Sequence, residues 1–438
     1  MHKVFPYQRR FAFCGLLAMG GFLACPSWGY QLTPIYNFTG GSDGMQVAGD
    51  LTIDSSGDIY ATSQALFDNP TNTGGGAIVE IMAGTHVGNV VVNFPSNAPG
   101  ALNIPAGPFI LDQSGNLTGL TVYGGTNNDG VLFKVASGSH SATTLASFNG
   151  PTTGANPFDS GLVSDSLGNF YGATDYGGQG YTTIDTGDGT LFKVAAGTST
   201  ISTLVTFNGN DGAIPVGKLL VTSDGTIYGA TREGGTSNDG TVYKLSPGST
   251  TPQTIATFNG SNGAYPAGGV IEDSHGNLYG MTTGTLEGYS GPGGVGSVYE
   301  IQAGTGQVIP LATFDTTNGA NPLNELYIDS NGNLFGTTNF GGTNNLGTVF
   351  EISAQTQKLA TIWSFSGSDG DFPASSLIAD AQGNIYGAAS HGGLYDDGDV
   401  FELTVPEPAS LTMLLAATSI LAFRRRSCRL DTVHAALK

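Results

Sequence analysis

The sequence predicts an all-β protein, a seven-bladed β-propeller of four-stranded antiparallel blades, and three observations carry that prediction. A seven-residue marker recurs seven times, each copy comes with four short β-type runs, and the composition disfavours helices. Only 11% of the 438 residues are charged, whereas glycine (69 residues) and proline (20) make up about a fifth of the chain. So few charges and so many turn-forming residues exclude long charged helices and coiled coils.

The marker reads Asp-x-x-Gly, then Asn, Asp or Thr, an apolar residue and an aromatic one. Residues 54–60 are one copy, and the copies at 112–118 and 222–228 are degenerate. Successive copies lie 51 to 58 residues apart. A hairpin turn with one positive φ accounts for its glycine, and the leading Asp can cap such a turn. The seven turn glycines are Gly57, Gly115, Gly168, Gly225, Gly276, Gly332 and Gly383.

Four short runs bounded by turn residues predict the strands of each unit. In the fourth unit they are 204–207, 218–221, 226–230 and 241–245. The last run has one charged residue between apolar neighbours, which predicts an outward-facing side chain on an exposed edge strand. These charged residues are Glu80, Lys134, Lys193, Lys244, Glu300, Glu351 and Glu402. Radial stacking would bury faces that no single unit can bury; the alternative, a linear β-solenoid, usually has shorter repeats.

The first 29 residues predict a secretory signal peptide. They contain a basic start, an apolar run at 11–24 and small residues before a predicted cleavage after Gly29. Lipoprotein processing before Cys25 is one alternative, but Phe22 stands where such signals usually have Leu. A retained membrane anchor is the other, but the apolar run is short for one.

The other end has Pro406, Glu407 and Pro408, an apolar stretch at 409–423, and then an arginine cluster, Arg424, Arg425 and Arg426. Fifteen helical residues span about 22 Å, short of a bilayer core of roughly 30 Å. This order resembles the PEP-CTERM sorting signal of Gram-negative bacteria that make extracellular polysaccharide. The resemblance implies Sec export, transient membrane contact through this short helix, and processing by exosortase at the cell envelope or surface. An ordinary anchor helix is the alternative.

These signals divide the chain into a signal peptide (1–29), a propeller (30–405), a sorting signal (406–426) and a tail (427–438) that is cytoplasmic or removed. The tail is longer than such signals usually have. The propeller region contains no cysteine, 32 acidic and 6 basic side chains, and therefore a net charge of −26. This charge disfavours nucleic acid and anionic lipid as partners, and the cysteine count excludes a disulfide scaffold.

The repeated words resemble the GloVer tandem repeat, which is itself propeller-like. They are Leu-Ala-Ser-Phe-Asn-Gly at 145–150, Gly-Ala-Asn-Pro at 154–157, Gly-Asn-Phe-Tyr-Gly-Ala-Thr at 168–174, and residues 235–244. The resemblance covers nearly all of the propeller region and is weakest in the first two units. It implies no catalytic residue.

Several local motifs are better explained by the repeat than by chemistry. Residues 40–44 fit the Gly-x-Ser-x-Gly nucleophile elbow, but similar words stand at the same place in sibling units. Residues 212–218 fit a phosphate-binding loop pattern but lack the Ser or Thr that should follow its Lys. Residues 291–296 fit the dinucleotide-binding pattern but are not followed by the helix that such a site needs. No cofactor is expected. A calcium site remains an alternative, because Asp329, Asn331 and Asn333 alternate as the ligands of a calcium loop do. The rest of the EF-hand pattern is not present.

One face of the predicted disc is the candidate ligand surface. The Phe-Asn-Gly turns and the Gly-Gly-Thr loops should share it, and the longest insertions, 175–189 and 283–296, fall there. Amides, carboxylates and tyrosines on these loops can hydrogen-bond and stack on sugars, or hold calcium; the alternative is solvated turns without a ligand. The candidates are Asn128, Asp129, Tyr181, Asn238, Asp239, Tyr289, Asn344, Asn345, Asp396 and Asp397.

Two functions follow as hypotheses. The first is a non-enzymatic surface or matrix propeller that is a scaffold or binds polysaccharide or surface proteins; the second is a propeller-fold lyase or glycosidase that acts on extracellular polysaccharide. What separates them is whether one unit has charged residues that its siblings lack, converging on the central channel. Arg232, the one arginine between the two signals, is such an oddity, although it can equally pair with Glu233.

Overall fold

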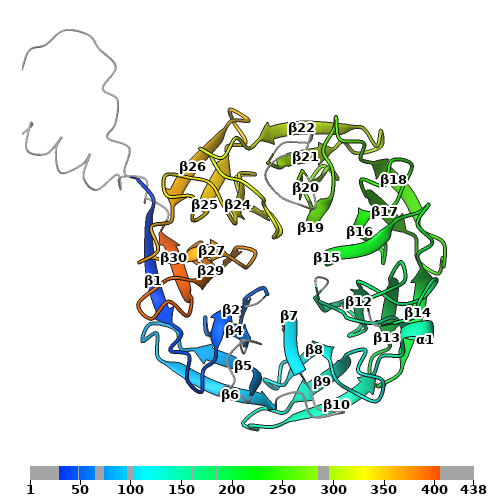
Figure 1. Ribbon diagram of the computed structural model, residues 1–438, viewed down its shortest axis with the longest axis horizontal. Coiled ribbons are helices and arrows are strands. Elements are labelled where there is room, and N and C mark those ends of the chain that lie inside the picture. Colours follow the sequence, from blue (N-terminus) through cyan, green and yellow to red (C-terminus); the bar gives the residue numbers. More distant parts are fainter. Residues whose placement is uncertain are drawn as a thin grey trace, which may run out of the picture.

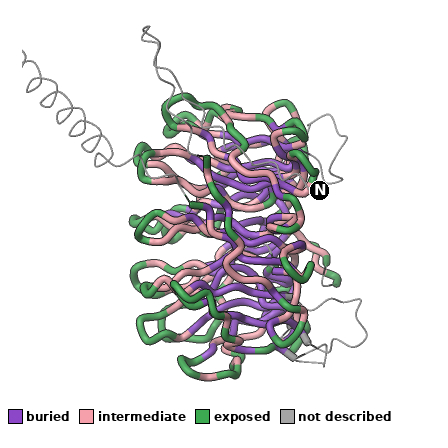
Figure 2. The backbone as a smooth tube through the Cα atoms, turned by 90° about the vertical axis from the view of Figure 1, so that its left-hand side faces the viewer, coloured by how far each residue is buried: buried purple, intermediate pink, exposed green. Residues whose placement is uncertain are grey.

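The computed structural model describes residues 29–404, except 48, 65–73, 96–102, 159–160, 184 and 285–294. The termini beyond this range, which include both predicted signals, lie outside the described residues. Seven antiparallel sheets surround a central axis, which confirms the seven-bladed propeller (Figure 1). Exposed loops form the two faces of the disc, and buried strands lie between them (Figure 2).

Each blade runs from an inner strand at the axis to an outer strand at the rim, and blades are numbered here from the one that begins at Met45. Blade 1 contains β2 (Met45–Val47), β3 (Thr52–Ile53), β4 (Ile59–Gln64), β5 (Gly74–Ile81) and β6 (Gly88–Pro95). Blade 2 contains β7 (Asn103–Leu111), β8 (Leu117–Tyr123), β9 (Val131–Val135) and β10 (Ala142–Ser147). A one-turn helix, α1 (Gly150–Thr153), leads into blade 3, with β11 (Val163–Ser164), β12 (Phe170–Thr174), β13 (Thr190–Val194) and β14 (Ile201–Thr206).

The remaining blades repeat this plan. Blade 4 contains β15 (Ala213–Val221), β16 (Ile227–Glu233), β17 (Thr241–Leu245) and β18 (Gln253–Thr257). Blade 5 contains β19 (Pro266–Glu272), β20 (Leu278–Thr282), β21 (Ser297–Ile301) and β22 (Val308–Thr313). Blade 6 contains β23 (Tyr327–Ile328), β24 (Leu334–Thr338), β25 (Thr348–Ile352) and β26 (Leu359–Ser364). Blade 7 contains β27 (Asp371–Pro373), β28 (Ile378–Ala379), β29 (Ile385–His391), β30 (Asp399–Thr404) and β1 (Gln31–Asn37).

Strand β1 closes the ring as the outer strand of blade 7. It pairs antiparallel with β30, from Gln31 opposite Thr404 to Asn37 opposite Asp399. The first and last strands of the propeller therefore lie side by side at the rim (Figure 1).

The predicted edge position of the charged runs is wrong. Lys244 lies on β17, the third strand of blade 4, which pairs with β16 on one side and β18 on the other. The sequence repeat begins with the outer strand of the preceding blade, so the last run of a unit forms the third strand of its blade and not the outer strand at the rim. In blades 1 and 4, for example, the charged side chain contacts a tyrosine of the second strand: the Tyr60 hydroxyl donates to Glu80 at 2.6 Å, and the Lys244 ammonium lies 5.8 Å from the centre of the Tyr228 ring.

Aromatic pairs join neighbouring blades. The Phe of each Phe-Asn-Gly word follows an outer strand and meets an aromatic ring on the third strand of the next blade. Phe207 and Tyr243, for example, meet edge to face with ring centres 5.2 Å apart, and both are fully buried. Such a pair is worth about 0.5–1.5 kcal/mol beyond its buried area. The glycine of the Tyr-Gly-Ala-Thr word admits this ring, because a Cβ on Gly229 would lie 2.2 Å from the Tyr243 hydroxyl oxygen.

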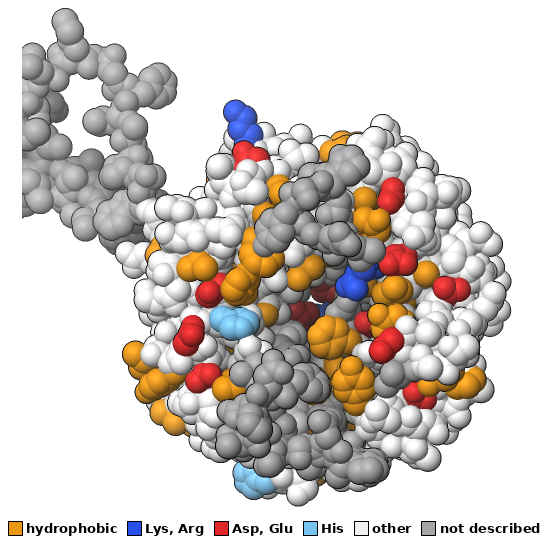
Figure 3. All heavy atoms as spheres, viewed as in Figure 1, with side chains coloured by type: hydrophobic (Ala, Val, Ile, Leu, Met, Phe, Trp, Pro, Cys, Tyr) orange, Lys and Arg blue, Asp and Glu red, His pale blue; other side chains and the backbone are white. Residues whose placement is uncertain are grey.

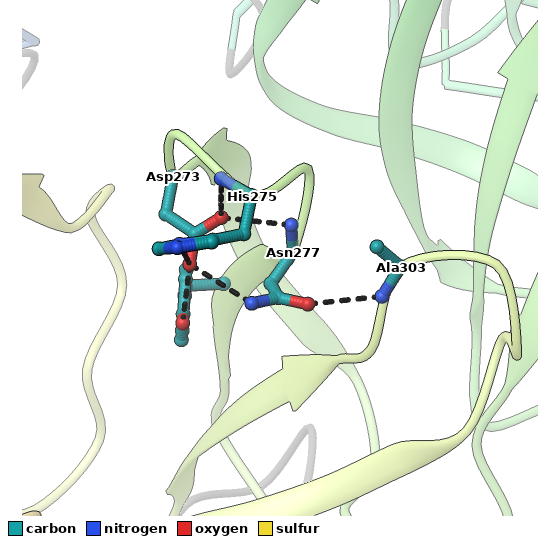
Figure 4. Close-up of polar contacts among 5 residues, drawn as sticks. Asp273, His275, Asn277 and Ala303 are labelled. Atoms are coloured by element: carbon teal, nitrogen blue, oxygen red, sulfur yellow. Dashed lines mark hydrogen bonds and ion pairs between the residues drawn. The ribbon is translucent and has the colours of Figure 1, made fainter.

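The marker forms the hairpin turn between the first and second strands of each blade. All seven marker glycines have φ between 75° and 89°. In blade 5 one carboxylate oxygen of Asp273 accepts the backbone amides of His275 and Asn277 at 2.8 and 2.9 Å (Figure 4). The Asn277 side chain donates to the other oxygen of Asp273 at 2.9 Å and accepts the Ala303 amide at 3.0 Å, which ties this turn to the next one. The carboxylate therefore faces N–H donors.

Candidate ligand site in the central channel

The predicted loops do share one face. The Gly235 amide of a Gly-Gly-Thr loop donates to the Gly209 carbonyl of a Phe-Asn-Gly turn at 2.8 Å. Asn128, Asn238 and Asn345 have φ between 60° and 63°. Each side-chain oxygen accepts the amide of a glycine four residues earlier in its own loop, at 3.1 Å. These asparagines therefore shape their loops.

The acidic loop candidates connect blades through their backbone. The carbonyls of Asp129, Asp239 and Asp397 accept amides from the next blade, with N to O distances of 2.8–2.9 Å. The Asp129 carboxylate is 2% exposed and accepts the Gly150 amide and the Tyr181 hydroxyl, both at 2.8 Å. This is the one pair of candidate side chains that bond to each other among the described residues.

The other described candidates make contacts within their own parts of the chain or are exposed. The Asn344 side chain donates to the Phe365 carbonyl at 2.8 Å, and Asp396 is exposed with φ of 66°. Burial, followed by the charges of Asp396 and Asp43, raises the pKa of Asp397. Tyr289 and the sorting residues Pro406, Glu407, Pro408, Arg424, Arg425 and Arg426 lie outside the described residues.

The best-formed cavity of the described part lies on the propeller axis. The predicted insertion 175–189 reaches it through Asp175, Tyr176 and Asp185, but none of the described candidate residues lines it. It has a volume of about 570 Å³ and is lined by residues of all seven blades. In Figure 3 the centre of the disc is hollowed, with acidic and basic side chains at and inside the opening.

One repeat position supplies three of the charged side chains of this cavity. It lies four residues before the first position of each turn marker and immediately before a buried apolar residue such as Leu219 or Leu326. We call its seven members the channel ring. They are Asp50, Pro108, Gly161, Lys218, Gly269, Glu325 and Ser376. Charged residues thus occupy this position in three blades, and small or non-ionisable residues occupy it in four.

Hydrogen bonds connect the channel ring across blades. The Ser376 amide donates to the Asp50 carboxylate at 2.6 Å, and the Glu325 amide donates to the Ser376 hydroxyl at 2.8 Å. The Glu325 carboxylate accepts the Lys218 amide and, at 3.2 Å, the Gly269 amide. Asp50, Ser376 and Glu325 therefore bind the inner segments of blades 1, 7, 6, 5 and 4 to one another.

Glu325 and Lys218 are the electrostatic centre of the cavity. Burial raises the pKa of Glu325 to about 7; the Lys218 charge opposes this rise, and the Asp50 charge adds to it. Lys218 is half-buried, and its ammonium makes no hydrogen bond or ion pair within the described part of the chain.

The mouth of the cavity has a different character. Phe158 and Leu323 are 44% and 40% exposed, whereas the equivalent Ala106, Val216 and Ala267 are buried. Arg232, Asp175, Asp185 and His391 also line the cavity. The one arginine between the predicted signals therefore does reach the central channel.

The segment that leads into the wall contains one strained residue in every blade. Seven non-glycine residues have φ of 51–57°, a left-handed conformation that costs free energy in side chains such as Ile. They are Gln46, Ile104, Asn156, Ile214, Tyr265, Asn321 and Phe372. Because all blades share this strain, it belongs to the common architecture of the blade.

A closed seven-bladed propeller with a polar cavity on its axis defines the class of this protein: a rigid ring whose inner strands present side chains to a common centre. The family model of the Gloeobacter/Verrucomicrobia repeat matches residues 180–401, just over half of the chain. The chain belongs to this repeat family, which confirms the resemblance drawn from the repeated words.

Solved structures share the fold. The extracellular domain of a one-component system of B. thetaiotaomicron matches with a TM-score of 0.54 and 12% identity over 87% of this chain. The present chain spans 40% of that domain's length. An oligogalacturonate lyase of Vibrio parahaemolyticus matches with a TM-score of 0.53 and 9% identity, covering 87% of this chain and 95% of the lyase. A search of curated proteins finds no match.

Among the described residues, no helix has the length and apolarity needed to cross a membrane.

Proposed function

We propose that this chain is an exported, non-enzymatic propeller of the cell envelope or surface that binds extracellular polysaccharide in its central channel. The observation that carries the proposal is the channel ring, where one repeat position has become Asp50, Lys218, Glu325 and Ser376 in four of the seven blades. Positions that serve the common fold, such as the marker glycines, are the same in all seven blades. Variation in charge at a position that lines a cavity supports a ligand-binding role.

The chemistry of the mouth favours sugars. An exposed aromatic ring, Phe158, lies on the same cavity as the carboxylate of Asp175 and the amides of Asn156 and Asn339. Pyranose rings have apolar faces that stack on aromatic rings and hydroxyl groups that bond to amides and carboxylates. A concave site in which polar groups converge beside an aromatic ring is typical of small-ligand pockets.

The carboxylates of the channel ring favour binding over cleavage. Glycoside hydrolysis needs two carboxyl groups that face the substrate, one of them as an acid. Asp50 accepts the Ser376 amide, and Glu325 accepts two backbone amides, so these oxygens hold the inner strands together.

The test mixes the purified protein with polysaccharide from the producing cells and measures both co-sedimentation and polymer chain length. We expect binding with unchanged chain length, and weaker binding for Phe158→Ala. The matched control is Leu167→Ala, which removes a 78%-exposed side chain from the marker turn of the same blade. Shortened polymer would contradict the non-enzymatic role, and absence of binding would contradict polysaccharide as the ligand and favour surface proteins.

The proposed route to the surface is Sec export followed by exosortase processing of the C-terminal signal. A chain that ends at Val405 should then be secreted freely, as judged by immunoblots of medium and envelope fractions. Retention of the shortened chain in the envelope, at the level of the full chain, would contradict this route.

A further inference from the structure

We propose that Lys218 makes the channel selective for acidic polysaccharide, by binding the carboxylate of a uronic acid residue. This inference rests on the proposed function, because it names the ligand class of the same cavity. It starts from the scarcity of positive charge: the propeller region has 6 basic side chains against 32 acidic ones.

The other lysines have roles outside the channel. Lys134 pairs with Asp112 at 3.8 Å, Lys193 and Lys244 lie over tyrosine rings of their own blades, and Lys358 is exposed. Lys218 alone among the lysines lines the described cavity. A half-buried ammonium without a hydrogen bond or ion pair to the described residues is ready to bond an anionic group, and such charge-assisted bonds are strong.

The charged groups around Lys218 set the conditions for binding. Asp50 and Glu325 line the same cavity from blades 1 and 6, and backbone amides donate hydrogen bonds to both carboxylates. Arg232 adds a second cation from blade 4, while Asp175, Asp185 and His391 line the rest of the cavity. A ligand carboxylate is therefore attracted by the two positive charges of blade 4, Lys218 and Arg232. Glu325 repels it when Glu325 is ionised and does not when Glu325 is neutral.

This arrangement predicts tighter binding of acidic sugars as the pH falls from 8 to 6. Burial raises the pKa of Glu325 to about 7, so this side chain becomes neutral over that range. Uronic acids stay ionised, because unperturbed carboxyl groups titrate near pH 4. The Lys218 charge then acts on the ligand without opposition from Glu325.

The experiment titrates the full-length protein with a glucuronic acid hexasaccharide and with its carboxyl-reduced, neutral counterpart, at pH 6 and pH 8, by calorimetry. We expect the acidic hexasaccharide to bind about tenfold more tightly, as one charge-assisted contact predicts. Lys218→Gln should remove this preference, Lys218→Arg should keep it, and Glu325→Gln should flatten the pH dependence. Lys244→Gln, which removes a lysine outside the channel, is the matched control and should behave as the parent.

The outcomes separate this inference from the proposed function. Equal affinity for both hexasaccharides, or an unchanged preference in a folded Lys218→Gln variant, overturns the selectivity and leaves the binding role in place. Failure of both hexasaccharides to bind overturns the polysaccharide-binding role itself. Cooperative thermal unfolding of each variant at the parent temperature shows that lost preference reflects the missing charge.

Discussion

Asp399 departs from the residue that the repeat has at its position, and this departure lowers the stability of the folded protein. In blades 3, 4, 5 and 6 the equivalent position is Thr or Ser, whose hydroxyl bonds to a Thr on the second strand at 2.8–3.0 Å. In blade 7 the corresponding pair is Ala389 and Asp399. Asp399 is completely buried, and neither of its carboxylate oxygens has a hydrogen-bond partner among the described residues. Burial, followed by the charge of Asp369, raises the pKa of Asp399 to about 8.

Replacing Asp399 by the residue of its siblings should therefore stabilise the protein. Because the folded-state pKa of Asp399 lies above the unfolded value near 3.9, this group destabilises the folded protein least at acidic pH, and its cost grows as the pH rises towards 8. Asp399→Thr should raise the free energy of unfolding by roughly 1–3 kcal/mol at pH 8, the cost of an unsatisfied buried polar group. Denaturant unfolding at pH 5 and pH 8 measures this, and a difference between the two proteins that fails to grow with pH would contradict it.

At the scale of the element, the marker turn makes two kinds of hydrogen bond with one short motif. Its Asp caps its own hairpin, and its Asn accepts an amide from the neighbouring turn, as at Asn116, Asn169, Asn277 and Asn333. The second connection joins the turn between the first and second strands of a blade to the turn between the third and fourth. The marker is therefore part of the blade's tertiary structure as well as a local turn.

Removal of one such connection should have a measurable cost. Asn277→Ala leaves the Ala303 amide without its acceptor and should lower the free energy of unfolding by about 1 kcal/mol. Asn331→Ala is the matched control, because the side chain of Asn331 makes one long contact of 3.4 Å on an exposed turn. If chemical denaturation gave equal losses for the two variants, the connection between turns would carry no stability.

The strands and turns could be predicted from the sequence because their signals are local. The sequence wrongly predicts the charged strand at the rim, because alternation shows only that one face of the strand is polar. It does not show that Lys244 contacts Tyr228 on the neighbouring strand. The channel ring escaped prediction for a related reason. Its signal, variation immediately before Leu219 and its equivalents, is visible when the repeats are aligned, but only closure of the ring brings Lys218, Glu325 and Asp50 to one cavity.

At the scale of the whole molecule, one strand completes the ring. Strand β1 supplies the outer edge of blade 7, and Leu32 and Phe401 belong to the same buried cluster. Neighbouring blades are otherwise joined through aromatic pairs such as Phe258 and Tyr299, whose ring centres lie 4.9 Å apart. The closure thus includes an antiparallel pairing between residues that are far apart in the sequence, in addition to the bonds between blades 7 and 1.

A chain that lacks residues 31–37 should be much less stable than the parent. It loses the outer strand of blade 7 and exposes the unpaired edge of β30, so we expect both a lower melting temperature and self-association. Calorimetry and size-exclusion chromatography measure these effects. A chain shortened after Thr404, which keeps every described strand, is the control. Unchanged melting of the chain without β1 would mean that closure contributes little.

The pairing of β1 with β30 also sets an order of events during biosynthesis. The chain is made from its N-terminus, so β1 is complete long before β30 exists, and it must stay single until the last blade arrives. Pro34 lies in the middle of β1, next to a shift in register, and has no amide hydrogen to offer to another strand. Pro34 thus disfavours the pairing of β1 with other strands before β30 has been made.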